Sequence, residues 1–185
     1  MKSRQIFKIL SLCTLLAIYS PLPGQDAVSC SEDSLFSVLD FWIGEWEVLD
    51  TSGTLVGKKR VAKVLDSCAV TEYWRGAGGS EGRSLFYVDN SNRQWKQVWV
   101  TSSATLPWGQ KEKTMISSPN DKTVIFQGSY QVQGKSILDR TILTPISPDS
   151  VTQEIQISAD DGVNWKTNFL GYYMRIKGTD SHETW

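Results

Sequence analysis

The sequence predicts an all-β protein, an antiparallel up-and-down barrel of about 8–10 strands that follows one short helix. Three observations predict this fold. Short runs of alternating or β-branched residues recur along the chain, and clusters rich in Gly, Pro, Asp, Asn and Ser separate them. Several of the runs also place Trp on the same strand face as Gln or Glu. Strands joined by short turns are typical of antiparallel sheets, and polar and aromatic side chains together suit the lining of a barrel.

The elements can be placed in chain order. A Ser cap, early acidic residues and apolar Leu35, Val38 and Leu39 predict a short helix within residues 31–39. The expected strands are residues 43–50, 57–66, 68–76, 82–89, 93–101, 112–118, 122–130, 135–143, 149–158 and 165–178. No internal repeat or linker divides them, so we expect one domain.

The first residues have the pattern of a secretory signal peptide. Residues 1–8 are basic, the segment from Ile9 to Tyr19 is almost unbroken apolar chain, and prolines and Gly24 follow. We therefore divide the chain into a signal peptide (1–24), an N-terminal arm with the short helix (25–39), the barrel domain (40–178) and a polar tail (179–185). The expected location is secreted or periplasmic. A lipoprotein anchored through Cys30 is less favoured, because polar and proline residues separate this cysteine from the apolar run.

Composition excludes several classes of partner and cofactor. With 19 Lys+Arg against 20 Asp+Glu, the chain has no excess of basic residues for nucleic acid. One His and three Cys cannot supply a four-ligand zinc site or an iron–sulfur cluster. The apolar run is shorter than the roughly 20 residues that a spanning helix needs. We expect no cofactor, no metal and no membrane-spanning segment.

Two cysteines remain once the signal peptide is removed, Cys30 and Cys68. An exported protein resides in an oxidising compartment, which favours a disulfide between them. Two buried thiols, or a free Cys30 in a loose arm, are the alternatives.

The two faces of the strands distinguish a barrel with a cavity from a compact sandwich. Trp95, Gln97 and Trp99 share one face of their strand, and Glu72 and Trp74 share one face of theirs. A sandwich core needs aliphatic residues without polar groups, whereas a ligand cavity can use aromatic and polar side chains together. We interpret these faces as the lining of a cavity. The alternative is that they form the outer surface.

The segment DFWIGEWEV, with Gly44 and Trp46, resembles the opening motif of lipocalins and the wider calycin barrels. The longer pattern is similar to a bacterial secreted family of unknown function that begins FDFW-(I/L)-G-x-W. Its further motifs match Phe41, Trp42, Cys68, Glu72, Trp74, Gly82, Ser84, Trp95, Gln97, Trp99, Ser158, Asp160, Gly162 and Trp165. The resemblance implies a barrel in which a late arginine, here Arg175, packs over Trp46. Haem-binding members of the superfamily use a late His, but His182 lies in the polar tail, so we expect no haem.

Two further motifs have structural interpretations. Asp160, Gly162 and Trp165 form the pattern of a hairpin turn that resembles the Asp-box of sialidase propellers. The segment Gly78 to Gly82 fits G-x-S-x-G, but a strand follows it instead of the helix that a nucleophile elbow requires. We interpret it as a hairpin loop.

The leading functional hypothesis is a binding barrel without catalysis, for a small hydrophobic or aromatic ligand with a polar head. The expected cavity residues are Glu72, Trp74, Ser84, Trp95, Gln97, Trp99 and Arg140. The alternative is an isomerase or cyclase that uses Glu72 as acid–base group and Arg140 as electrostatic partner. A third possibility is a filled barrel that binds a protein partner through an exposed Trp108 or Trp185.

Overall fold

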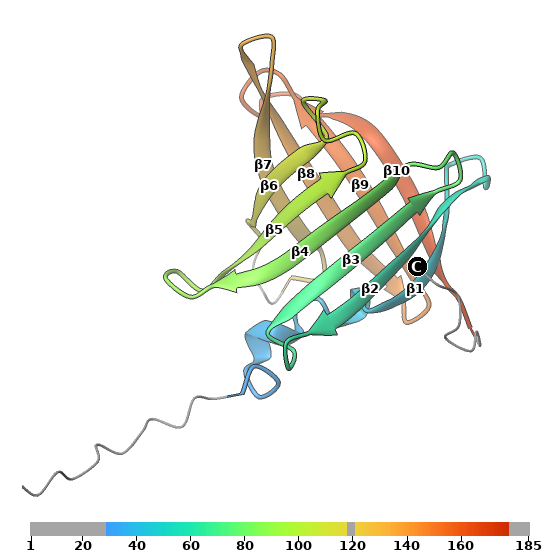
Figure 1. The fold of residues 1–185 in the computed structure, drawn as a ribbon, viewed down its shortest axis with the longest axis vertical. Helices are drawn as coiled ribbons and strands as arrows, with labels where there is room; N and C mark the ends of the chain where they lie inside the picture. The colour runs from blue at the N-terminus through green and yellow to red at the C-terminus, as the bar shows by residue number, and fades with distance from the viewer. Residues whose placement is uncertain (1–28, 118–120, 178–185) are drawn as a thin grey trace, which may run out of the picture.

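The computed structural model describes residues 29–117 and 121–177, and these form a closed ten-stranded antiparallel barrel (Figure 1). The predicted fold class is thereby confirmed. The elements are η1 (Ser34–Ser37), η2 (Asp40–Trp42), β1 (Gly44–Leu49), β2 (Leu55–Val64), β3 (Ala69–Gly76), β4 (Glu81–Asp89), β5 (Gln94–Thr101), β6 (Gln110–Met115), β7 (Val124–Val132), β8 (Lys135–Ser147), β9 (Ser150–Ser158) and β10 (Lys166–Arg175).

Every strand pairs with the strands before and after it in the chain, and β1 pairs with β10 to close the barrel. The predicted strands match the observed ones closely, apart from their ends. β8 continues to Ser147, beyond the expected end at residue 143, because it keeps pairing with β9 past a bulge near Pro145. The predicted helix of residues 31–39 is instead two short 3₁₀ helices, and the residue that caps the first is Asp33. Among the described residues, no helix has the length and apolar character needed to cross a bilayer.

The up-and-down topology gives the barrel two different ends. At one end lie η1, η2 and the connections that follow β2, β4, β6 and β8, and we call this the arm end. At the other, the hairpin end, lie the connections that follow β1, β3, β5, β7 and β9, near the top of Figure 1. The inward-facing side chains differ in chemical character between the two ends, and this difference decides at which end the candidate site lies.

The arm half of the barrel is filled by apolar side chains. Strand alternation turns every second residue inward, and in this half those residues are aliphatic or aromatic. The buried cluster consists of Leu39, Trp42, Trp46, Val48, Val61, Val70, Phe86, Trp95, Met115, Val124, Phe126, Leu143, Val151 and Tyr173. Trp42 and Trp46 stack with ring centroids 5.6 Å apart, and the Trp46 indole donates to the Trp42 carbonyl. This end of the barrel is therefore plugged.

Arg175 lies over the Trp46 ring, with its guanidinium carbon 4.2 Å from the ring centroid. Its Nη1 donates to the Ile43 carbonyl oxygen over 2.7 Å. Gly44 has φ +144°, and a Cβ at this position would overlap the Arg175 guanidinium. The glycine is needed for this close approach. The late arginine thus packs over the opening tryptophan, as the lipocalin resemblance implies.

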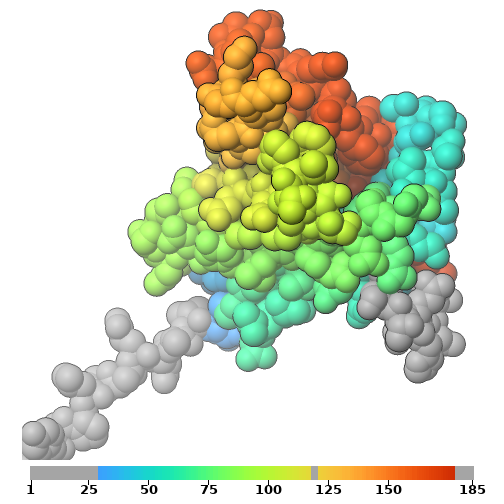
Figure 2. Space-filling view, turned by 45° about the horizontal axis from the view of Figure 1, so that its top comes forward, coloured from blue at the N-terminus to red at the C-terminus, as the bar shows by residue number. Residues whose placement is uncertain are grey.

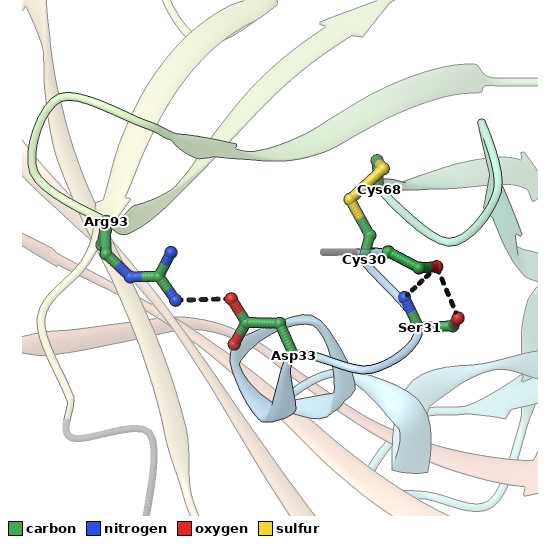
Figure 3. The surroundings of a disulfide bond; sticks show 6 residues. Cys30, Ser31, Asp33, Cys68 and Arg93 are labelled. Atoms are coloured by element: carbon green, nitrogen blue, oxygen red, sulfur yellow. Dashed lines mark hydrogen bonds and ion pairs between the residues drawn. A yellow bond between two sulfur atoms is a disulfide. The ribbon is translucent and has the colours of Figure 1, made fainter. Parts of the chain in front are cut away.

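The N-terminal arm is fastened to the barrel at three points. A disulfide joins Cys30 with Cys68, the residue that precedes β3 (Figure 3). Beside it, the Arg93 guanidinium pairs with the Asp33 carboxylate over 2.6 Å, and this hydrogen bond holds the pKa of Asp33 below its usual value. The indole of Trp95 donates to a carbonyl oxygen in η1. Residues 1–28, which include the expected signal peptide, lie outside the described residues.

Removal of the disulfide tests how far the arm stabilises the fold. The bond spans 38 residues of sequence, and a loop of that size restricts the unfolded chain by about 3–4 kcal/mol in the chain-entropy model. Replacing Cys30 and Cys68 together with Ser is expected to lower the free energy of unfolding by that amount in urea denaturation. Reduced wild-type protein is the control and should match the double variant. An unchanged denaturation midpoint would contradict the prediction.

The turn between β9 and β10 has the structure that its motif predicts. The Asp160 carboxylate accepts hydrogen bonds from the backbone and side chain of Asn164 and from the Ser158 hydroxyl. These bonds lower the pKa of Asp160 to about 2. Gly162 has φ +86°, and the Trp165 indole donates to its carbonyl oxygen. The motif is a structural turn.

Candidate functional site

The hairpin half of the barrel encloses a cavity of about 210 Å³. Figure 2 turns this end toward the viewer and shows the hairpins that surround it, from the cyan β1–β2 turn to the orange β7–β8 turn. The lining residues come from β2, β3, β5, β6, β8, β9 and β10. They are Lys59, Glu72, Trp74, Gln97, Trp99, Lys111, Lys113, Thr141, Gln153, Ile155, Phe169 and Tyr173.

The cavity becomes more exposed toward the hairpin end. Lining residues halfway along their strands, such as Lys59, Glu72 and Lys113, are buried. Those closer to the hairpin end, such as Trp74 and Trp99, are half-buried. This gradient indicates that the cavity opens at the hairpin end and has its floor above the apolar plug.

Lys59 is the centre of the first polar cluster on the floor. Its ammonium group lies 2.9 Å from a Glu72 carboxylate oxygen and donates to Gln153 over 3.1 Å. The Tyr173 hydroxyl donates to the same Gln153 oxygen, and the rings of Trp42 and Tyr173 lie within cation–π range of the ammonium. Burial alone would lower the pKa of Lys59, but Glu72 and Tyr173 together raise it above its ordinary value. Lys59 is therefore a charged and fully partnered group.

The second polar cluster has two lysines and one carboxylate. Asp139, buried on β8, contacts the ammonium groups of both Lys111 and Lys113, and Lys113 also donates to the Thr141 hydroxyl over 2.7 Å. Burial lowers the pKa of Lys111 to about 8. Burial, together with the charge of Lys111, holds the pKa of Lys113 well below its ordinary value. One carboxylate does not balance two ammonium groups, and together with burial this disfavours the charged form of Lys113 as long as no further anion is present.

Gln97 leaves one polar atom of the floor unsatisfied. Its side-chain nitrogen donates to the Ser84 hydroxyl over 3.0 Å. Its side-chain oxygen is buried, and no hydrogen-bond partner for it exists among the described residues. Buried polar atoms are nearly always paired, so this acceptor is available to a hydrogen-bond donor inside the cavity.

Aromatic rings form the walls above the floor, and glycines on neighbouring strands give them room. Trp74 on β3 pairs beside Lys59 on β2, and its ring covers Gly57. The ring of Trp99 in the same way covers Gly82, and a Cβ on either glycine would overlap the indole. The indoles consequently lie flat along the wall, which leaves the space between them open.

The structure places most of the predicted cavity residues inside the barrel. Glu72, Trp74, Gln97 and Trp99 line the cavity, and Ser84 is buried on the floor through its bond to Gln97. Trp95 also faces inward, but it belongs to the apolar plug near η1 and does not line the cavity. The role of these residues in binding stays a prediction.

The prediction that Arg140 faces the interior is wrong. Its neighbours Asp139 and Thr141 are buried inside the barrel, so strand alternation places Arg140 on the outer face. There its guanidinium lies 3.9 Å from the Trp165 ring centroid and donates to Gln156. The acid–base pair of Glu72 with Arg140, on which the isomerase or cyclase alternative depends, does not exist. In the structure Glu72 pairs with Lys59.

Sequence reasoning missed the charged half of the site. Three lysines (Lys59, Lys111 and Lys113) and Asp139 face inward, although such residues usually face solvent. A signal was available for the first of them. In the β2 segment GKKRVAKV, Lys59 shares its strand face with Gly57 and Val61, both of which are buried. Gln153 and Tyr173 were also missed, because only the pairing register of the strands shows which inward side chains lie next to one another.

Other candidate features lie outside the cavity. Ser80 of the G-x-S-x-G segment is exposed in the β3–β4 hairpin, and β4 follows it directly. Trp108 is half-exposed in the segment between β5 and β6, whereas Trp185 and His182 lie outside the described residues. Within the described ranges, no cluster of His, Cys, Asp and Glu has the arrangement of a metal site.

The fold and the site define a class of protein: a closed antiparallel barrel with one plugged end and a polar, aromatic-walled cavity at the other. Neither a protein-family model nor a curated protein matches the chain.

Proposed function

We propose that this chain is a secreted or periplasmic lipocalin-like protein that binds a small molecule in its barrel and performs no chemistry on it. The observation that carries the proposal is the contrast between the two halves of the interior. The arm half is filled by apolar side chains, whereas the hairpin half keeps a cavity of about 210 Å³. A barrel that served only as a scaffold would gain stability by filling both halves.

The lining supports a ligand with an apolar or aromatic body and a polar head. The walls offer Trp74, Trp99 and Phe169 for contact with a flat ring, and the floor offers charged groups and the free acceptor of Gln97. Binding sites for small molecules usually combine apolar walls with a few placed polar groups. The volume lies below the ~300–1,000 Å³ of typical drug-sized pockets, so the ligand is compact.

Three features support the lipocalin-like and exported character of the protein. Arg175 packs over Trp46, and Gly44 provides the space for it, as in the family that the opening motif resembles. A disulfide between Cys30 and Cys68 is typical of proteins that mature in an oxidising compartment. The basic and apolar pattern of residues 1–24 also supports export.

A neutral fluorescent probe tests the proposal. N-phenyl-1-naphthylamine, which becomes fluorescent in apolar sites, is expected to bind with one site per chain. Replacing Ile155 with Phe fills part of the cavity and should weaken binding about tenfold or more, since the probe would lose buried contacts.

The matched control for this test is Leu85→Phe. Leu85 is an exposed aliphatic residue on β4, so the larger ring should change neither the affinity for the probe nor the fold. Equal binding by all three proteins would place the probe outside the cavity. Absence of binding to the wild type, of this probe and of the two smaller probes described below, would contradict the proposal.

A further inference from the structure

The charged groups around the cavity do not balance. Lys59, Lys111 and Lys113 line it, together with one carboxylate, that of Glu72. A second carboxylate, that of Asp139, is buried against Lys111 and Lys113. Among the described residues, three lysines therefore face two carboxylates in the low-dielectric half of the barrel, so one lysine has no carboxylate to stabilise its charged form. An uncompensated charge in such a place is costly, and an anion would remove the cost.

The excess charge has a definite position. The Lys59 ammonium is held by Glu72 and Gln153 on the floor. Lys111 and Lys113 share Asp139, and Lys111 is nearer the hairpin end, beside the half-buried ring of Trp99 with which it pairs across the sheet. Lys111 keeps some access to solvent, whereas Lys113 is almost completely buried. An anion that enters from the hairpin end therefore meets Lys111 first.

The surroundings also restrict the body that carries the anion. Trp99 and Trp74 stand beside the lysines as flat walls, and Phe169 and Ile155 also line the cavity. A compact planar ring could lie against these side chains while its charged group reaches Lys111.

We propose that the ligand is a small aromatic carboxylate whose carboxylate group binds between Lys111 and Lys113 and whose ring lies against Trp99. This inference rests on the proposed function and specifies the chemical class of its ligand. The two lysines supply charge-assisted hydrogen bonds, which are stronger than neutral ones. A neutral ligand of the same shape would supply no counter-charge for the second lysine.

Two probes of nearly equal shape test the charge requirement. 2-Naphthoate and its uncharged analogue 2-naphthamide are titrated into the full chain by isothermal titration calorimetry at pH 7. We expect 2-naphthoate to bind about ten to a hundred times more tightly, the range expected for charge-assisted hydrogen bonds. Lys111→Gln should remove this preference, and Lys111→Arg should retain most of it.

Control variants separate charge at the site from charge in general. Lys96 lies on the outer face of β5, where it donates to Thr114, and Lys96→Gln should leave the preference intact. Thermal unfolding checks that each variant is folded. If Lys111→Gln does not fold, Lys111→Met serves as the second variant, and a preference that survives in a folded variant overturns the inference.

The outcomes for the two proposals differ. Equal binding of 2-naphthoate and 2-naphthamide would overturn the anion inference and leave the binding function intact. Binding of N-phenyl-1-naphthylamine without binding of 2-naphthoate would likewise overturn the anion inference and leave the binding function intact. If none of the three probes binds, the proposed function itself fails.

The affinity should also depend on pH. The groups that face Lys111 are Lys113 on β6, Asp139 on β8 and the Tyr130 ring on β7. Burial lowers the pKa of Lys111 to about 8, so the free protein loses this charge as the pH rises through 8. The affinity for 2-naphthoate should fall between pH 7 and pH 10, while that for 2-naphthamide stays constant. A flat profile for 2-naphthoate would contradict the assigned role of Lys111.

Discussion

Replacing Trp46 with Ala is expected to lower the free energy of unfolding by about 4 kcal/mol, within the range for truncation of a buried tryptophan. The Trp46 side chain is completely buried at the arm end, stacked on Trp42 and covered by the Arg175 guanidinium. Its removal leaves a void in the plug and deprives Arg175 of its cation–π partner. The measurement is urea denaturation followed by circular dichroism.

Trp108→Ala is the control for this truncation. Trp108 is half-exposed in the segment between β5 and β6, so its loss should change the free energy of unfolding by less than about 0.5 kcal/mol, as surface substitutions usually do. A loss below about 1 kcal/mol for Trp46→Ala would contradict the plug. The stability of the barrel would then depend on contacts outside the plug.

Replacing Glu72 with Gln is expected to destabilise the fold by about 3 kcal/mol, the lower limit for breaking a buried ion pair. The variant leaves the Lys59 ammonium buried without its carboxylate, 2.9 Å away in the wild type. The remaining polar neighbours, Gln153 and Tyr173, cannot replace a negative charge. Stability should also become more sensitive to pH, because Lys59 would lose the partner that helps to raise its pKa.

A double variant isolates the pair. In Lys59→Met with Glu72→Gln both charges are absent, and a buried ion pair exchanged for uncharged residues is often neutral. The double variant should therefore recover most of the stability that Glu72→Gln loses. The alternative result is that the double variant loses as much free energy of unfolding as the two single variants together. The two groups would then act independently, and the floor of the cavity would have been assigned wrongly.

The fold could be predicted from the sequence because its signals are local. Alternation of side chains and clusters of turn residues located every strand, and the motif around Gly44 and Trp46 indicated how the barrel closes. Strand ends were less predictable, because bulges such as that near Pro145 depend on the pairing partner. The short helix before the barrel was also predicted, although it is a 3₁₀ helix over Ser34–Ser37, followed by a second over Asp40–Trp42.

The site was only half predictable. Aromatic residues such as Trp74 and Trp99 were found because they alternate with outward residues in clear strand patterns. Arg140 was misplaced by one position, and a shift of one residue moves a side chain to the other face of the sheet. The inward lysines were missed because their partners are distant in sequence. Lys113 and Asp139, for example, come into contact only when the strands have assembled into the barrel. Such pairs have no local signature.

Nuclear magnetic resonance of the indole N–H groups tests the central claim most directly. During a titration with 2-naphthoate, the indole signals of Trp74 and Trp99, which line the cavity, should shift and saturate together. Those of Trp42, Trp46 and Trp95, buried in the plug, should move little. Shifts confined to Trp108, or no shift at any tryptophan, would contradict the account, because the space inside the barrel would then not be a binding site.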